Sequence, residues 1–234
     1  MIDIRIALTL LLVGAVMPVA AHAQRSPAQG ATPGPWTDLL AGGAQRSWRG
    51  YKQPTLPDGW TYEAATGILA RTGSGGDIVT RTEYGDFELE LEWRIAAGGN
   101  SGVFYRATEA HGAIYESAPE MQVLDDALHR DGQSPLTSAG ANFGLYPAVP
   151  RAVRPAGEWN RALLFVQGNS VEHWLNGVRV VHYTLGSDDW AAKVAASKFA
   201  QWPAYGRAPK GRIGLQDHGD LVEFRNVRIR ELAP

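Results

Sequence analysis

The chain has 234 residues, no cysteine and a formal net charge of -2 at pH 7. The lack of cysteine excludes disulfides, thiolate metal sites and thiol nucleophiles, and the lack of a basic surplus argues against nucleic acid as a partner. A chain of this length without a change of composition predicts one domain, since single β-sandwiches run to roughly 200–250 residues.

The amino-terminal residues have the features of an export signal. Residues 6–19 form an almost unbroken apolar run, and residues 21–23 supply the small-x-small pattern that a signal peptidase needs. The run is shorter than the roughly 20 residues of a membrane-spanning helix. We therefore expect a signal peptide over 1–23, a flexible leader over 24–35 and a folded domain over 36–234. The expected location is periplasmic or secreted, without membrane attachment after cleavage.

The first half of the domain is predicted to form strands. Residues 85–94 alternate strictly between apolar and charged side chains, and this period of two predicts one buried and one polar face. Another short strand is expected over residues 120–125. Residues 126–156 are irregular, and loops of such length are usually functional.

The second half continues with hairpins. Strands are predicted over residues 161–167 and 170–175, and Asn176-Gly177 is the strongest short hairpin signal of the chain. A helix is expected only over residues 187–199, because Ser187 can cap its start.

The last strand and the overall class follow from the same pattern. The apolar positions of residues 221–232 change parity, which predicts a β-bulge near Arg225-Asn226. Many antiparallel strands with at most one or two short helices predict an all-β antiparallel sandwich.

Strand parity also brings together polar side chains that suit proton transfer. Glu120 and Gln122 point away from the apolar side of their strand, and Gln216 and His218 share one face of the segment 212–218. If both strands lie in one sheet, a carboxylate, an imidazole and two amides could meet across it and act on a sugar. The alternative is that these residues are merely solvent-facing.

Four further residues are candidates for sugar contacts. Trp202 could stack on a sugar ring, and Arg106 could bind ligand oxygens next to Tyr105. His173 is included, although a lone histidine among apolar neighbours is more often a core residue.

No cofactor is predicted. A divalent metal held by Glu120, Asp217 and His218 is conceivable, but no local spacing requires it, so no metal ligand is assigned. Asp217 could equally be a turn residue or could orient a neighbouring histidine. Asp125 and Asp126 are better explained as turn residues, whose side chains bond nearby backbone groups.

Seven motifs in order resemble those of a known family, the 3-keto-disaccharide hydrolases. They are Gly85-Asp86-Phe87-Glu88-Leu89, Asn100-Ser101-Gly102-Val103-Phe104-Tyr105-Arg106, Glu120-Met121-Gln122-Val123-Leu124-Asp125, Gly157-Glu158-Trp159-Asn160, Trp174-Leu175-Asn176-Gly177, Gly211-Arg212-Ile213-Gly214-Leu215-Gln216-Asp217-His218-Gly219 and Phe224-Arg225-Asn226-Val227. The resemblance spans roughly residues 36–232. It implies a concanavalin-like jelly-roll fold and a small carbohydrate as substrate, and it leaves the oligomeric state open.

The resemblance also implies a chemistry, the cleavage of glycosidic bonds in sugars oxidised at C3. The ketone acidifies the proton at C2, a base removes that proton, and the enolate expels the C1 oxygen, after which water can add. Within this scheme Glu120 is the expected base and His218 the acid or enolate donor. Gln122, Gln216 and Arg106 are expected to hold hydroxyl groups.

Two alternatives stay open. A retaining glycoside hydrolase on the same fold needs two carboxylates about 5–5.5 Å apart, but Gln122 stands where such enzymes carry Asp, and Asp125 has the opposite parity to Glu120. A non-catalytic sugar-binding module is the other alternative, because the fold alone does not separate binding from catalysis.

Overall fold

The computed structural model describes residues 33–233. The predicted signal peptide and the leader up to residue 32 lie outside the described residues. Within residues 33–233, no helix is long and apolar enough to cross a bilayer.

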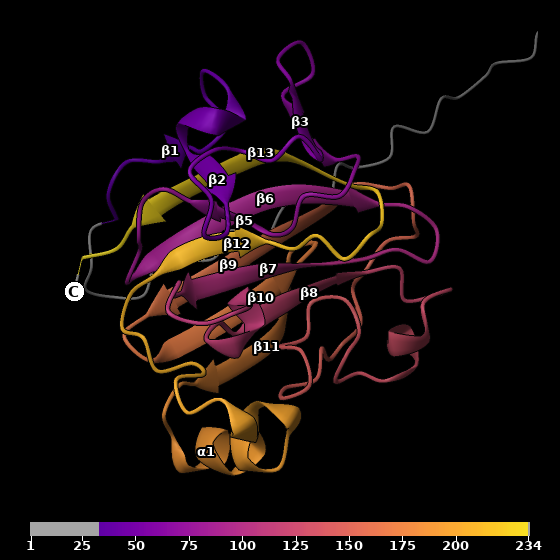
Figure 1. Cartoon of the computed structure of the whole chain (residues 1–234). Helices are drawn as coiled ribbons and strands as arrows, with labels where there is room; N and C mark the ends of the chain where they lie inside the picture. Colours follow the sequence, from indigo (N-terminus) through magenta and orange to yellow (C-terminus); the bar gives the residue numbers. More distant parts are fainter. Residues whose placement is uncertain (1–32, 234) are drawn as a thin grey trace, which may run out of the picture.

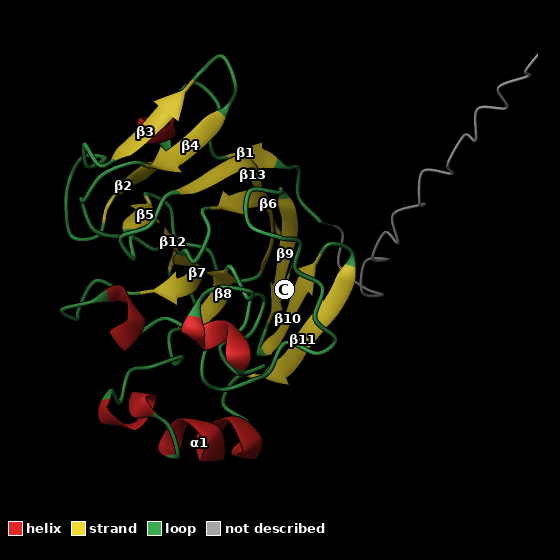
Figure 2. Cartoon of the chain, turned by 90° about the vertical axis from the view of Figure 1, so that its right-hand side faces the viewer, coloured by secondary structure: helices red, strands yellow, loops and turns green. Residues whose placement is uncertain are grey.

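Two antiparallel sheets face each other and form the predicted sandwich (Figures 1 and 2). The large sheet has the order β11 (Val178–Thr184), β10 (Ser170–Leu175), β9 (Asn160–Gln167), β6 (Phe87–Ile95), β13 (Val222–Glu231), β4 (Ile68–Arg71) and β3 (Trp60–Glu63), with β1 (Thr37–Asp38) on β13. The small sheet has the order β2 (Trp48–Gly50), β5 (Ile78–Thr80), β12 (Arg212–Leu215), β7 (Asn100–Ala107) and β8 (Glu120–Leu124). The all-β prediction is confirmed.

Helical structure is confined to short segments. The α-helix α1 (Asp188–Ala195) lies at one end of the sandwich (Figure 1), and Ser187 Oγ caps it by accepting a hydrogen bond from the Trp190 N–H at 3.2 Å. The 3-10 turns are η1 (Ala44–Arg46), η2 (Ile114–Glu116), η3 (Arg130–Gln133) and η4 (Lys198–Gln201). The predicted helix therefore exists, but it is shorter than residues 187–199.

The predicted hairpin and bulge are both present. β10 pairs with β11 across the Asn176-Gly177 turn, and both turn residues have positive φ, as this turn type requires. The register of β13 on β6 shifts between Arg225 and Arg228, where Asn226 has a φ of 52°. The extra residue keeps the inward-facing side chains of β13 in the core on both sides of the shift.

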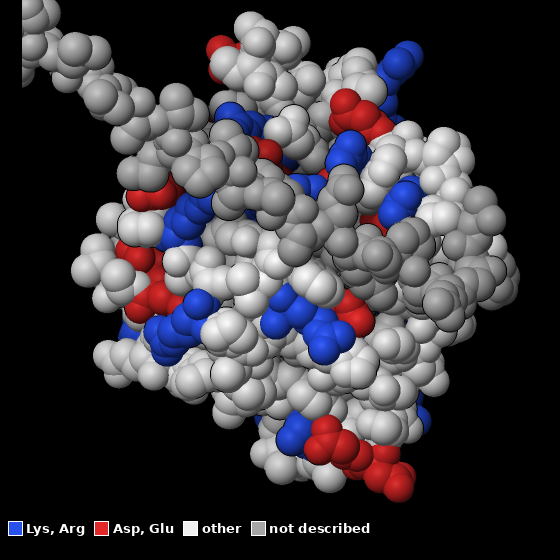
Figure 3. All heavy atoms as spheres, turned by 180° about the vertical axis from the view of Figure 1, so that it is seen from behind, with Lys and Arg blue, Asp and Glu red and all other residues white. Residues whose placement is uncertain are grey.

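The polar face of the large sheet is a ladder of ion pairs. On this face Glu90 contacts Arg228 and Arg161, while Glu92 contacts Arg225. Figure 3, which views the molecule from behind, shows basic and acidic side chains interspersed there. Because these carboxylates are already paired across neighbouring strands, a chemically active carboxyl group has to be sought on the small sheet.

The long loop after β8 seals the edge of the small sheet. The Gln122 N–H donates to the Ala141 carbonyl, and the N–H groups of Gly140 and Phe143 donate to the carbonyls of Gln122 and Glu120, at 2.8–3.0 Å. The loop thus pairs with β8 almost as a further strand does and protects its edge. This contact also shields the outward-facing side chains of β8 from solvent.

Candidate active site

A row of polar residues crosses the outer face of the small sheet. Gly102 on β7 pairs with Gln122 on β8, and the Gln216 N–H donates to the Gly102 carbonyl at 3.0 Å. Asp77 precedes β5, whose first residue pairs with the last residue of β12. The row therefore crosses four neighbouring chain segments, in the order Asp77, Gln216, Gly102 and Gln122.

The carboxyl group of Glu120 lies over Gly102, where the row has no side chain. A Cβ atom at position 102 would stand 2.1 Å from Glu120 Oε1, which is closer than atoms can approach. The Gln122 amide is oriented so that its nitrogen faces hydrogen-bond acceptors. In this orientation the nitrogen donates to Glu120 Oε1 at 3.2 Å and to the Ser101 carbonyl at 2.8 Å. The glycine and the amide together fix the position of this carboxyl group.

Burial dominates the electrostatics of Glu120. The residue is only 7 % exposed, and within residues 33–233 it has no ion-pair partner. Removal from water raises the pKa of its carboxyl group to about 8; the Lys198 charge opposes this shift, while Asp77 and Asp131 add to it. A group with such a pKa can exchange protons close to neutral pH.

Asp77 is a second perturbed carboxyl group on this face, and sequence reasoning missed it. The Asp217 N–H donates to Asp77 Oδ1 at 2.9 Å, and burial raises the pKa of the Asp77 carboxyl group to about 6. Two strand spacings of about 4.8 Å separate Asp77 from Gly102, and Gln216 lies on the chain segment between them.

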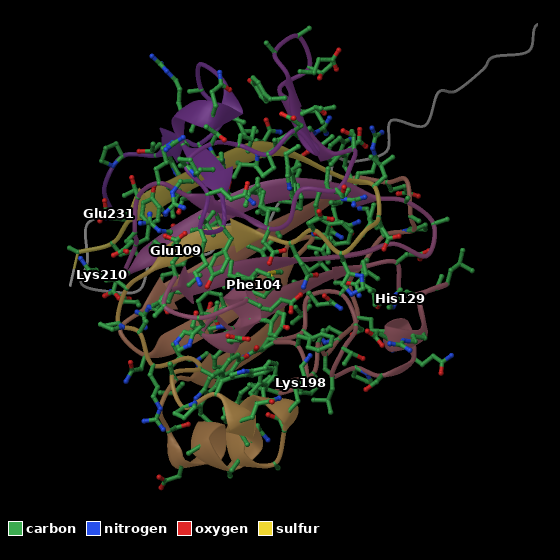
Figure 4. All side chains as sticks on the ribbon, viewed as in Figure 1. Phe104, Glu109, His129, Lys198, Lys210 and Glu231 are labelled. Atoms are coloured by element: carbon green, nitrogen blue, oxygen red, sulfur yellow. The ribbon has the colours of Figure 1, made fainter. Side chains whose placement is uncertain are left out.

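An apolar cluster closes one side of the row. Phe104 pairs with Glu120 across β7 and β8 and lies near the middle of this face (Figure 4). Ile114 of η2 packs over it and reaches Gly214, where a Cβ atom would be 2.4 Å from Ile114 Cδ1. These residues are fully buried and cover the side of the row next to Phe104.

Gln216 lies in the same row, beside Gly102. Its Oε1 is buried and has no hydrogen-bond partner among the described residues. An amide oxygen without a partner is costly in a folded protein and often marks a functional position. It could accept a hydrogen bond from a hydroxyl group of a bound sugar.

His218 does not join Glu120 in the way that strand parity suggested. β12 ends at Leu215, so His218 lies in an exposed loop, where its ring is 6.4 Å from the ring of His129. Asp217 does not orient it, because the Asp217 carboxylate accepts the N–H groups of Gly75 and Gly76 and pairs with Arg71. His218 stands two residues beyond Gln216, at the rim of the row.

The position of His218 also bears on the metal site that the sequence left undecided. Among residues 33–233, no group of three or more His, Cys, Asp or Glu side chains could hold a metal ion. Glu120, Asp217 and His218 do not converge. Asp125 accepts the N–H groups of Gly98 and Ala127, which matches its predicted role in a turn.

Tyr105 and His173 have to be removed from the predicted substrate contacts. Both are fully buried between the sheets, with ring centroids 6.3 Å apart. His173 Nδ1–H donates to the Gly140 carbonyl at 2.9 Å, and burial lowers the pKa of the His173 imidazole to about 4. Tyr105 has the parity of its core-facing neighbour Val103, whereas the substrate would lie on the opposite face.

Arg106 and Trp202 lie away from the Glu120 carboxyl group. The Arg106 guanidinium donates to the carbonyls of Gly85 and Gly168 and pairs with Asp86. Trp202 lines a separate hollow of about 640 Å³ beside α1 and η4, and Glu120 is not among the residues that line it. Arg106 also lines this hollow, but its guanidinium is held by protein groups, whereas Trp202 remains a candidate for stacking.

We expect Arg106→Met to destabilise the fold by about 2–4 kcal/mol, because buried carbonyl groups lose a charged donor. Urea unfolding measures this loss. Arg130→Met is the matched control, since the Arg130 side chain is 89 % exposed. An Arg106 variant of full stability but raised KM would instead restore its predicted role in substrate binding.

Comparison with known proteins identifies the family. A family model described as a 3-keto-alpha-glucoside-1,2-lyase-like domain matches residues 35–230. The chain belongs to this family. It is 38% identical over 224 residues to a 3-keto-disaccharide hydrolase of Bacteroides thetaiotaomicron, which covers 83% of this chain and 77% of the relative. The resemblance stated from the sequence motifs is confirmed.

Solved structures agree with the family assignment. A putative glycosyl hydrolase from Parabacteroides distasonis shares 32% identity with a TM-score of 0.78, covering 85% of this chain and 94% of that one. A second from the same organism shares 29% identity with a TM-score of 0.65, covering 84% and 99%. A Bacillus subtilis protein with a galectin-like fold, at 12% identity and a TM-score of 0.55 over 87% and 99%, shares the fold alone.

Proposed function

We propose that this member of the 3-keto-disaccharide hydrolase family cleaves glycosides of 3-keto sugars by removing the proton at C2 and eliminating the group at C1, with Glu120 as the base. The observation that carries the proposal is the Glu120 carboxyl group itself. It is buried over Gly102, and its pKa is raised to about 8. The chain segment that bonds Gly102 carries Gln216, whose buried Oε1 has no hydrogen-bond partner among residues 33–233.

The reaction balances without an oxidant or reductant. The Glu120 carboxylate takes the C2 proton, and the C–H electron pair forms the C2–C3 double bond of an enolate whose charge lies on the C3 oxygen. That pair then forms the C1–C2 double bond while the C1–O bond breaks, and the departing oxygen takes a proton. Addition of water, with hydroxide at C1 and a proton at C2, gives the free 3-keto sugar.

The other residues of the row have separate tasks in this scheme. The Gln122 amide orients Glu120, and Gln216 binds a substrate hydroxyl group through Oε1. The negative charge of Asp77 helps to raise the pKa of Glu120 and so strengthens it as a base. We assign the leaving-group proton to His218, because its imidazole follows Gln216 by two residues and is exposed.

The proposal predicts a sharp substrate preference. Purified protein should release free sugar from a 3-keto-glucoside and leave the matching unoxidised glucoside intact, because only the ketone acidifies C2. Chromatography of both reactions measures this difference. Cleavage of the unoxidised glucoside would instead favour an ordinary glycoside hydrolase that uses Glu120 and Asp77 as its acid and base. Binding without cleavage of either compound would favour a sugar-binding module.

A further inference from the structure

Among residues 33–233, no carboxylate forms an ion pair with the Lys198 ammonium group. Its ammonium nitrogen lies 4.6 Å from the ring centroid of Phe143 and 5.3 Å from that of Phe199. Lys193, five residues earlier in α1, instead pairs with Asp189 at 3.2 Å. Two aromatic faces thus hold the Lys198 ammonium in place without cancelling its charge.

This cation stands next to the strand that carries Glu120. The Phe143 N–H donates to the Glu120 carbonyl at 3.0 Å, so the ring beneath the ammonium belongs to the loop segment paired with β8. A hollow of about 400 Å³ opens at this point and is lined by Leu136, Phe143, Lys198 and Phe199 among others. Figure 4 shows Lys198 where the helical end meets the sheet, on the same side as Phe104.

The charge of Lys198 also bears on the electrostatics of the Glu120 carboxyl group. Among the charges that affect Glu120, Lys198 has the largest effect, and it lowers the pKa that burial raises. Asp77 and Asp131 oppose it. An anion formed on a substrate beside Glu120 would feel the same positive charge.

We propose that the Lys198 ammonium stabilises the negative charge that develops on the C3 oxygen of the substrate when Glu120 removes the C2 proton. This inference rests on the proposed function and names the group that stabilises its enolate. A preorganised charge at the place where an anion develops is usually the largest single contribution to such a reaction, and loss of one donor commonly costs about 10²–10³ in rate.

Enolate formation can be measured apart from bond cleavage. A 3-keto-1,5-anhydro sugar lacks the exocyclic oxygen at C1 and has only the ring oxygen there, so exchange of its C2 hydrogen with solvent can be followed without cleavage of a glycosidic bond. In D₂O, NMR should show rapid exchange with the unchanged protein. Lys198→Met should lower kcat for exchange by on the order of 10²-fold. Lys198→Arg should retain most of the rate, because it keeps the charge.

Two controls separate this role from a structural one. Lys193→Met removes a lysine from the same helical end and should exchange within twofold of the unchanged protein. The pH profile of Lys198→Met should shift its rising limb to higher pH, since Glu120 loses a neighbouring cation, while its thermal unfolding stays close to that of Lys193→Met.

Each outcome decides between the two proposals. Equal exchange by Lys198→Met and the unchanged protein would overturn the role of Lys198 and leave the proposed function standing. If Lys198→Met loses exchange and Lys198→Arg loses it equally, the charge is not what matters and the inference is also wrong. No exchange by the unchanged protein would refute the enolate route itself, and the role of Lys198 with it.

Discussion

Glu120→Gln should lower turnover of a 3-keto-glucoside by at least about 10³-fold, because the amide cannot accept the C2 proton; general-base catalysis contributes about 10²–10⁴-fold. The shape of the side chain is kept, so KM should change little. Steady-state kinetics measure both constants. Glu158→Gln is the control, since Glu158 is exposed in the loop before β9 and should behave as the unchanged protein.

The same substitution should stabilise the fold in alkaline solution. In the unfolded chain a glutamate ionises near pH 4.3, whereas in the folded protein burial raises the pKa of Glu120 to about 8. The unchanged protein therefore loses stability relative to Glu120→Gln as pH rises between these values. The loss levels off above pH 8, at on the order of 5 kcal/mol. Urea unfolding at pH 5 and pH 8.5 measures it.

This raised pKa also fixes the pH dependence of turnover. A base must be ionised, so kcat should rise with pH up to about 8 if Glu120 removes the C2 proton. A rate that falls through this range would mean that the protonated form of Glu120 is the active one. An unchanged rate in Glu120→Gln would remove Glu120 from the mechanism altogether.

Gly102→Ala should lower kcat by about 10²-fold, because the new methyl group takes the place of the Glu120 carboxyl group and misplacement of about 1 Å has this cost. A Cβ atom there would be 2.1 Å from Oε1 and 2.7 Å from Cδ of Glu120. Gly102 does not have a positive φ, so alanine suits the backbone. The stability loss should stay within about 1–3 kcal/mol.

Two comparisons test the reason for this loss. Gly73→Ala is the matched control, because a Cβ atom there would meet only an ordinary contact at 3.5 Å, and its activity should be unchanged. In the double variant with Glu120→Gln, Gly102→Ala should cost almost nothing further, since it acts through that side chain. Additive losses would show that Gly102 matters for another reason.

Local patterns predicted the fold well. The period of two in β6, the cap at Ser187 and the parity change at Arg225-Asn226 each depend on residues close in sequence, and the structure confirms all three. Parity along β8 also predicted correctly that Glu120 and Gln122 point away from the core. These are the cases in which neighbouring residues alone decide the conformation.

The rest of the site depends on contacts that are distant in sequence. His218 was expected to continue the face of β12, but the Asp217 carboxylate binds backbone N–H groups near residue 75 and the strand stops at Leu215. Asp77 became visible only through the pairing of β5 with β12. Lys198 belongs to no sequence motif. Its place near Glu120 follows from the packing of η4 against the loop after β8, which the local sequence does not predict.

Loss of the C2 proton before the C1–O bond breaks leaves an isotopic label at C2 that can be measured in heavy water. A 3-keto-glucoside is cleaved in D₂O, and the C2 position of the product is examined by NMR at early times, with the product alone as the control for spontaneous exchange. If the enolate forms, every product molecule made by the enzyme should carry deuterium at C2. Product that keeps its original hydrogen at C2 would contradict it, because the C1–O bond would then have broken without an enolate.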